Sequence, residues 1–131
     1  MSGTPIVAIV EDDEAVRESL SDLLAALNVS PRAFDRAEAF LAAFGSGRFD
    51  CLITDVKMPG IGGIELLQRL RALGASIPTI VITSATDPLT RARALQGGAH
   101  AVLAKPVSED ALIRHLKSAL NWDFTRDNEA K

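Results

Sequence analysis

The sequence predicts an α/β fold in which a doubly wound sheet of five parallel strands is covered by helices on both faces. Short apolar runs alternate along the chain with longer stretches in which apolar residues recur at helical spacing. Strands that alternate with helices in this way form parallel sheets with right-handed crossovers. Polar residues follow four of the apolar runs directly, which places them together at the carboxyl edge of that sheet.

Five segments have the composition of strands. Ile6–Val10 is an unbroken apolar run rich in β-branched residues, as expected for a strand that is covered on both faces. Val29–Phe34 is expected to be a shorter strand that Pro31 weakens. The remaining strands are Cys51–Thr54, Thr79–Thr83 and Ala101–Ala104. For a chain of this length we predict the flavodoxin-like order 2-1-3-4-5, which sets the first and third strands side by side.

The first two helices are predicted from apolar stripes and from signals at their ends. From Asp13 the apolar period becomes helical, and Asn28 offers an end to this helix. Its inner stripe is Val16, Leu20, Leu23, Leu24 and Leu27. The segment from Asp35 to Glu38 resembles a capping box with Asp35 as the cap, and Gly45 ends the second helix. Its inward side chains are Phe40, Leu41 and Phe44.

The third and fourth helices differ in apolar content. The third has a full stripe and ends at Gly74. That stripe is Ile64, Leu67, Leu70 and Leu73. In the fourth helix Asp87 can act as the cap and Pro88 suits the first position, but the inner stripe is narrow. It consists of Leu89, Ala92 and Leu95, while Arg91 and Arg93 face elsewhere. Low burial favours a helix that can shift, although a merely solvated face explains the pattern equally well.

The last helix and the chain ends set the expected domain boundaries. Ser108 is expected to cap this helix, with Glu109 and Asp110 placed favourably in its first turn. Its inner side chains are Leu112, Leu116 and Leu120. The domain is therefore expected to span residues 6–121, with residues 1–5 as an N-terminal tail and residues 122–131 as a C-terminal tail or the start of a linker.

Composition narrows the class of protein. An apolar content of 47% supports a real core, and a net charge of -3 argues against nucleic-acid binding by this domain. Neither a run of ~20 apolar residues nor a signal peptide is present, so we expect a cytoplasmic domain with no membrane partner. The single cysteine, Cys51, excludes an intrachain disulfide and a CxxC metal site, and it is expected in the core. His100 and His115 are isolated in the sequence and are expected on the surface rather than as ligands.

Polar residues gather where four of the strands end. They are Glu11, Asp12 and Asp13 after the first strand, Asp55 after the third, Thr83 and Ser84 after the fourth, and Lys105 after the fifth. Crowded carboxylates repel one another unless a hard cation joins them or one keeps a proton. Mg²⁺ fits such a site because it takes oxygen ligands and phosphate oxygens. A carboxylate can also act as a nucleophile that forms an aspartyl-phosphate, with Lys105 and Thr83 placed to hold the phosphoryl oxygens.

These motifs, in this order, resemble the receiver domains of response regulators in two-component signalling. The matching segments are Ile9–Asp13, Asp55–Gly60, Thr83–Ala85 and Lys105-Pro106. The resemblance implies that Asp55 is phosphorylated, in an Mg²⁺-dependent reaction, by a partner histidine kinase or phosphotransfer protein. It also implies that the domain is not an enzyme on external substrates, although it takes part in its own phosphorylation and dephosphorylation.

The resemblance assigns roles by motif position. The metal ligands would be Asp12, Asp55, the backbone carbonyl of Lys57 and, through a water, Glu11. Thr83 would be the switch hydroxyl and Lys105 the phosphate-binding lysine, while Asp13 falls one place later, at the start of a helix.

Two positions depart from the family pattern. Gly62 stands where an acidic or amide cap commonly precedes the following glycine, and glycine is a tolerable cap. Val102 stands where the family usually has a Tyr or Phe that turns inward when the hydroxyl moves. We therefore expect a switch carried by the loop after Thr83 and by the fourth helix. It would change the surface formed by that helix, the fifth strand and the last helix, which is the expected site of a homodimer or another partner.

Other functions fit these residues less well. A phosphatase of the haloacid dehalogenase type needs a second aspartate two residues after its nucleophile, where this chain has Lys57. A flavin-binding electron carrier cradles phosphate after the first strand, where Glu11–Asp13 would repel it. A Walker-type nucleotide site lacks its signature. A receiver-like domain that signals by docking alone stays open, and phosphorylation of Asp55 would decide between the two.

Overall fold

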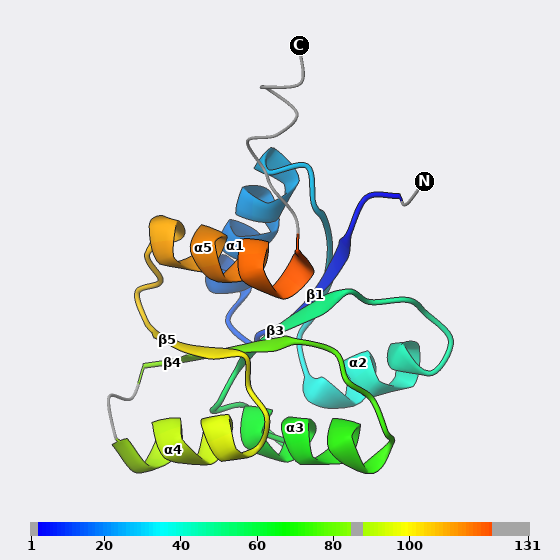
Figure 1. Ribbon diagram of the computed structural model, residues 1–131, viewed down its shortest axis with the longest axis vertical. Coiled ribbons are helices and arrows are strands. Elements are labelled where there is room, and N and C mark those ends of the chain that lie inside the picture. The colour runs from blue at the N-terminus through cyan, green and yellow to red at the C-terminus, as the bar shows by residue number, and fades with distance from the viewer. Residues whose placement is uncertain (1–2, 85–87, 122–131) are drawn as a thin grey trace.

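Five parallel strands form one sheet in the order β2-β1-β3-β4-β5, as predicted (Figure 1). The computed structural model describes residues 3–84 and 88–121. The strands are β1 (Ile6–Val10), β2 (Ser30–Phe34), β3 (Cys51–Asp55), β4 (Thr79–Thr83) and β5 (Ala101–Ala104). Pro31 does not interrupt β2, because this strand lies at the edge of the sheet and pairs with β1 alone.

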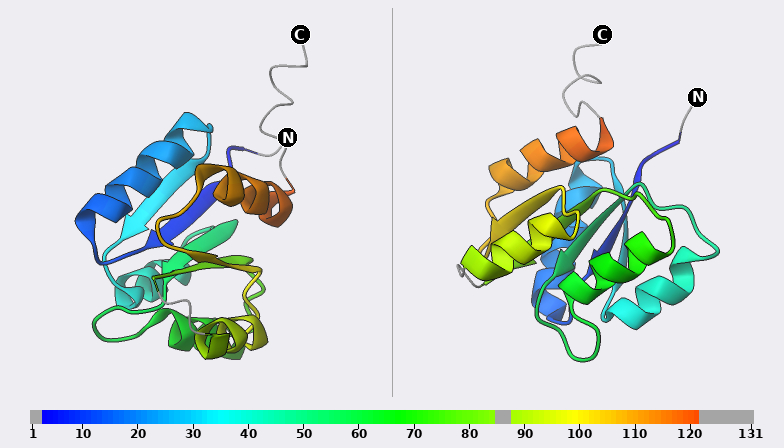
Figure 2. Two further views of the ribbon diagram at one scale, coloured as in Figure 1. Left: turned by 90° about the vertical axis from the view of Figure 1, so that its left-hand side faces the viewer. Right: turned by 60° about the horizontal axis from the view of Figure 1, so that its bottom comes forward.

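Helices cover both faces of the sheet, so that the domain has three layers. They are α1 (Glu14–Ala26), α2 (Ala37–Phe44), α3 (Gly63–Ala72), α4 (Pro88–Gln96) and α5 (Glu109–Leu120). Figure 2 shows α1 and α5 on one face and the other three helices on the opposite face. The face of α1 and α5 is packed by Leu20, Leu24, Leu112 and Leu116 against Val7, Ile9, Ile53, Ile80 and Ile82. The opposite face holds a cluster around Phe40, Leu66 and Leu70 and a smaller one around Ala94.

Side chains cap the first turns of α1 and α5, at Asp13, where the helix was expected to start, and at Ser108, the predicted cap. Asp13 Oδ1 accepts a hydrogen bond from Val16 N at 3.2 Å, and Ser108 Oγ accepts one from Ala111 N at 3.3 Å. Each cap satisfies an amide that has no partner within its helix. Asn28, just after α1, has φ 62° and Gly74, just after α3, has φ 77°, so both occupy the left-handed region that ends a helix.

The predicted cap of α2 is wrong. The residue at the cap position is Arg36, which makes no side-chain cap hydrogen bond. Asp35 Oδ1 instead accepts a hydrogen bond from Arg36 Nε at 3.3 Å, because the adjacent guanidinium competes for the carboxylate. The inward face of α2 is as predicted, with Phe40 fully buried.

The stripe predicted for α3 is partly wrong. Leu67 and Leu70 are buried as predicted, but Leu73 is 66% exposed. Leu73 lies after the last helical residue, Ala72, so the helical face that carries the stripe does not reach it. Leu66, which the stripe omits, is fully buried.

The stripe predicted for α4 is wrong, because its leucines face outward. Leu89 is 57% and Leu95 44% exposed, Ala92 is exposed as well, and Ala94 is the buried residue of this helix. Ala94 packs with Val81 of β4 and Val102 of β5. Because Ala94 faces the sheet, the helical period places Leu89 and Leu95 on other sides of α4, toward solvent.

Some predictions fall on residues that the structure does not describe. Asp87, the expected cap of α4, lies outside the described residues, as does the whole expected C-terminal tail from residue 122. Among the helices of residues 3–84 and 88–121, none has the length and apolar content needed to span a membrane.

Candidate functional site

Asp55 is the last residue of β3, the central strand, and lies at the carboxyl edge of the sheet. The register pairs Thr54 of β3 with Val10 of β1, and Asp55 with Ile82 of β4. Glu11 follows β1 directly and therefore lies beside Asp55, while Thr83 follows Ile82 on the other side. Asp55 is 8% exposed, so its carboxylate is held by a buried strand but still reaches solvent.

Three carboxylates come together at this edge. One oxygen from each of Glu11, Asp12 and Asp55 lies within 4.8 Å of the others. Glu11 is only 2% exposed, whereas Asp12 is exposed. A set of three carboxylate oxygens fits a hard cation such as Mg²⁺, which prefers oxygen ligands and keeps part of its water shell. Asp13 is not part of the cluster, because its carboxylate caps α1, the helix that it was expected to start.

Lys105 joins two of these carboxylates. Its Nζ donates to Asp55 Oδ2 at 2.8 Å and lies 3.1 Å from Glu11 Oε1. The second oxygen of each carboxylate accepts a backbone amide: Val56 N donates to Asp55 Oδ1 at 2.7 Å, and Asp13 N donates to Glu11 Oε2 at 3.1 Å. Both carboxylates are therefore fixed at both oxygens, with the ammonium offsetting part of their charge.

The ionisation of this group follows from burial and pairing. Burial raises the pKa of Glu11 above its ordinary value, and the negative charge of Asp55 adds to this rise. Hydrogen bonds from the Asp13 amide and from Lys105 lower the same pKa but do not cancel the rise. Burial acts to lower the pKa of Lys105, but its hydrogen bonds to Asp55 and Glu11 outweigh burial and raise that pKa above its ordinary value. Lys105 is therefore a firmly held positive charge at the site.

Thr83 ends the strand that pairs with β3 beside Asp55, and Lys57 follows Asp55 by two positions in the chain. Thr83 ends β4, is 3% exposed, and receives through its carbonyl a hydrogen bond of 2.9 Å from Lys105 N. Lys57 lies in the loop after β3 with an exposed side chain. The structure brings Thr83 and Lys105 to one edge of the sheet through β4 and β5, which pair in parallel.

Two glycines let α3 begin directly against the backbone of Asp55. A Cβ atom at Gly62 would lie 2.7 Å from the carbonyl oxygen of Val56, and one at Gly63 would overlap the carbonyl oxygen of Asp55. Gly63 N donates to Val56 O at 2.9 Å, which closes this loop. Gly62 is thus more than the tolerable cap expected from the sequence, because a side chain there would require the Val56 carbonyl to shift.

Sequence reasoning missed two arginines that donate to backbone carbonyls, one of them beside the carboxylate cluster. Arg17 of α1 donates from Nη1 to the carbonyl oxygen of Glu11 at 2.9 Å and to that of Asp12 at 3.5 Å. Arg91 of α4, expected to face elsewhere, donates from Nη1 to the carbonyl oxygen of Val102 at 3.2 Å. The sequence carries no signal for either contact, because each arginine donates to a backbone carbonyl whose position depends on the finished fold.

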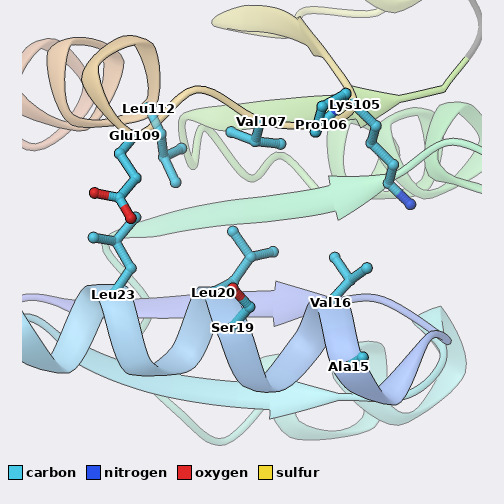
Figure 3. Close-up of a pocket in the computed structure, with 10 residues that line it drawn as sticks. All are labelled: Ala15, Val16, Ser19, Leu20, Leu23, Lys105, Pro106, Val107, Glu109 and Leu112. Carbon is cyan, nitrogen blue, oxygen red and sulfur yellow. The ribbon is translucent and has the colours of Figure 1, made fainter.

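An apolar groove of about 560 Å³ lies between α1 and the start of α5 (Figure 3). Its walls include Val16, Leu20 and Leu23 on one side and Val107 and Leu112 on the other. Lys105 is at one end of the groove, and its ammonium points away from the groove toward the carboxylates. The groove and the carboxylate cluster are therefore neighbours rather than one cavity.

The cysteine and the histidines lie apart from the cluster. Cys51 is fully buried, and burial raises the pKa of its thiol to about 12, so it is a core residue as predicted. His100 Nε2 lies 3.1 Å from Ser118 Oγ of α5, on the surface. Burial, with the charges of Arg114 and His100, lowers the pKa of His115. The structure places neither histidine in the carboxylate cluster.

Comparison with known sequences finds one family and many relatives. The sequence profile of the response regulator receiver domain matches residues 7–117. The transcriptional regulatory protein FixJ of Bradyrhizobium diazoefficiens is 37% identical over 114 residues, which cover 87% of this chain and 56% of FixJ. The response regulator protein TodT of Pseudomonas putida is 34% identical over 115 residues, which cover 88% of this chain and 51% of TodT. The chain thus spans about half the length of these relatives.

Solved structures share the whole fold. A structure described as FixJ-N has a TM-score of 0.85 at 35% identity and covers 92% of this chain and 96% of its own. A structure of a response regulator from Chloroflexus aurantiacus, described there as putative, has a TM-score of 0.85 at 30% identity and covers 92% of this chain and 100% of its own.

Proposed function

Because this chain belongs to the response regulator receiver domain family of two-component signalling, we propose that Asp55 accepts a phosphoryl group from a histidine kinase or a phosphotransfer protein. The observation that supports this most is the contact of 2.8 Å between Asp55 Oδ2 and Lys105 Nζ, inside a cluster that also holds Glu11 and Asp12. A rigidly held carboxylate with a fixed positive charge beside it suits a nucleophile that receives an anionic group.

The transfer exchanges one bond to phosphorus for another. An oxygen of the Asp55 carboxylate attacks the phosphorus atom, the bond from phosphorus to the donor imidazole breaks, and the imidazole leaves with a proton taken from water. Lys105 holds an oxygen of the transferred group, and the Thr83 hydroxyl donates to another. Mg²⁺, held by Asp12, Asp55, the carbonyl of Lys57 and, through a water, Glu11, would offset charge on the phosphoryl group.

We also propose the extent of the domain, its location and its partners. We place the receiver domain at residues 6–121 and its action in the cytoplasm, with no nucleic-acid binding of its own and no turnover of external substrates. Its partners are the phosphoryl donor and a second copy of the chain, which docks on α4, β5 and α5. The exposed leucines of α4, Leu89 and Leu95, support this surface because they are apolar side chains turned to solvent.

The test is direct chemical labelling. A small phosphodonor such as acetyl phosphate, with Mg²⁺, should label wild-type protein at Asp55, and mass spectrometry of peptides should locate the added group. Asp55→Asn should abolish the label, whereas Asp13→Asn, which changes a nearby carboxylate outside the cluster, should keep it. A phosphoryl group found on another residue, or equal labelling of Asp55→Asn, would contradict the proposal. Absence of any label would favour a domain that signals by docking alone.

A further inference from the structure

Arg17 fixes the backbone of the loop that presents two of the carboxylates. It lies on the first turns of α1, half-buried, and its Nη1 donates to the carbonyl oxygens of Glu11 and Asp12 at 2.9 and 3.5 Å. On the opposite side of the same residue, Glu11 N donates to Phe34 O of β2 at 3.1 Å. The backbone of Glu11 is therefore held by β2 at its amide and by Arg17 at its carbonyl.

Asp12 depends on this restraint more than its neighbours do. The carboxylates of Glu11 and Asp55 are each fixed by Lys105 and by a backbone amide. Within the described ranges 3–84 and 88–121, the Asp12 carboxylate makes no hydrogen bond or ion pair. Its place in the cluster is thus set by its backbone alone. Because a peptide group is planar, holding the carbonyl of Glu11 also fixes the orientation of the Asp12 amide that follows it.

Repulsion makes such a restraint necessary. Three carboxylate oxygens lie within 4.8 Å of one another, and Asp12 is the exposed member of the three. Without a cation to join them, like charges favour an arrangement in which the exposed carboxylate turns away into solvent. The arginine holds the loop against that movement.

We propose that Arg17 is a positioning residue which, by binding the carbonyls of Glu11 and Asp12, keeps the Asp12 carboxylate in the cluster and so strengthens Mg²⁺ binding. This rests on the metal site of the proposed function. Among the described residues Arg17 makes no ion pair with a carboxylate of the cluster, and its effect passes through the backbone.

Electrostatic repulsion alone predicts the opposite effect of Arg17 on the affinity for Mg²⁺. A guanidinium beside a cation site repels the cation, so removing it would by charge alone strengthen Mg²⁺ binding. A positioning role predicts weaker binding, since residues that orient metal ligands change affinity by about tenfold or more when they are removed. The direction of the change therefore separates the two roles.

Calorimetric titration of the full chain with Mg²⁺ tests this. We expect Arg17→Ala to bind Mg²⁺ about tenfold more weakly than wild type, and Arg17→Lys, which can still donate to a carbonyl, to recover part of the loss. Arg69→Ala is the matched control, because it removes the same charge from an exposed ion pair with Glu65 on α3 and should leave the affinity unchanged. Arg17→Met, which keeps an unbranched side chain on α1, replaces Arg17→Ala if that variant does not fold.

A second readout needs no metal. Hydrogen exchange of the Asp13 amide, which donates to Glu11 Oε2, should be faster in Arg17→Ala and unchanged in Arg69→Ala. Mg²⁺ binding by Arg17→Ala that equals or exceeds the wild-type affinity would overturn the role of Arg17 while leaving the metal site intact. A wild-type protein that binds no Mg²⁺ would contradict the proposed metal site, and the inference with it.

Discussion

The helices α5 and α4 pack on opposite faces of the sheet and are held there in different ways. In α5, Leu112 and Leu116 are fully buried and Ser108 caps the first turn. In α4, Ala94 is the buried residue, and Leu89 and Leu95 are exposed.

Arginine–carbonyl hydrogen bonds add to the small apolar contact of α4. Arg91 of α4 donates to Val102 O at 3.2 Å, and Arg71 of α3 donates to Gln96 O at 3.1 Å. Replacing such a hydrogen bond with one to water costs little free energy. Exposing a buried leucine to water costs much more. We therefore expect α5 to belong to the rigid frame of the site, and α4 to be the helix that a change at Asp55 can move.

The largest expected effect comes from truncating a leucine in each helix. Leu112→Ala should lower the free energy of unfolding by about 3 kcal/mol, because it leaves a cavity among buried side chains. Leu95→Ala makes the same chemical change on α4 and should alter that free energy by no more than about 0.5 kcal/mol. Urea denaturation of both variants measures the difference. Similar losses for the two leucines would show that α4 is packed as firmly as α5.

A smaller effect is expected from the arginine that joins α4 to β5. Arg91→Met keeps the unbranched side chain and similar helix propensity but removes the hydrogen bond to Val102 O, so α4 should open more easily, by about 1 kcal/mol. Native-state hydrogen exchange should show faster exchange of α4 amides and no change in α5. Arg93→Met is the control, since among the described residues Arg93 makes no hydrogen bond to β5. Equal effects of the two variants would argue against a specific role for Arg91.

The smallest effect concerns pH and α5. Burial lowers the pKa of His115, so the folded state favours its neutral form. The unfolded chain therefore binds more protons than the folded chain near pH 6. The stability that His115 contributes is present above its ordinary pKa of about 6.5 and is lost as the pH falls through its lower pKa in the folded state. Urea unfolding at about pH 7.5 and pH 5.5 should therefore show a slightly larger loss on acidification for wild type than for His115→Gln. A larger loss for His115→Gln would reverse the assigned direction.

The contrast between α5 and α4 also explains which predictions from the sequence succeed. The strands, their order and the inner face of α5 are confirmed, because large apolar side chains at regular spacing are most stable when that face is buried against the sheet. In α4 the leucines are the most apolar residues, yet it is the small Ala94 that packs against the sheet. Sequence patterns report how apolar a residue is and not how closely two backbones can approach.

The candidate site also contains residues that the sequence could place and contacts that it could not. Residues at the ends of strands, such as Asp55 and Lys105, could be placed because parallel strands end at one edge of the sheet. The contacts of Arg17 and Arg91, and the close approach at Gly62, could not, because each involves a backbone carbonyl whose position depends on the finished fold.

The most direct test of the central claim, that a group on Asp55 displaces α4, is amide NMR with and without beryllofluoride, a mimic of the phosphoryl group. We expect chemical shift changes at Thr83 and through Leu89–Gln96, with the amides from Leu112 to Leu116 of α5 nearly unchanged, and no changes in Asp55→Asn. Changes confined to the residues around Asp55, with Leu89–Gln96 unaffected, would contradict the claim.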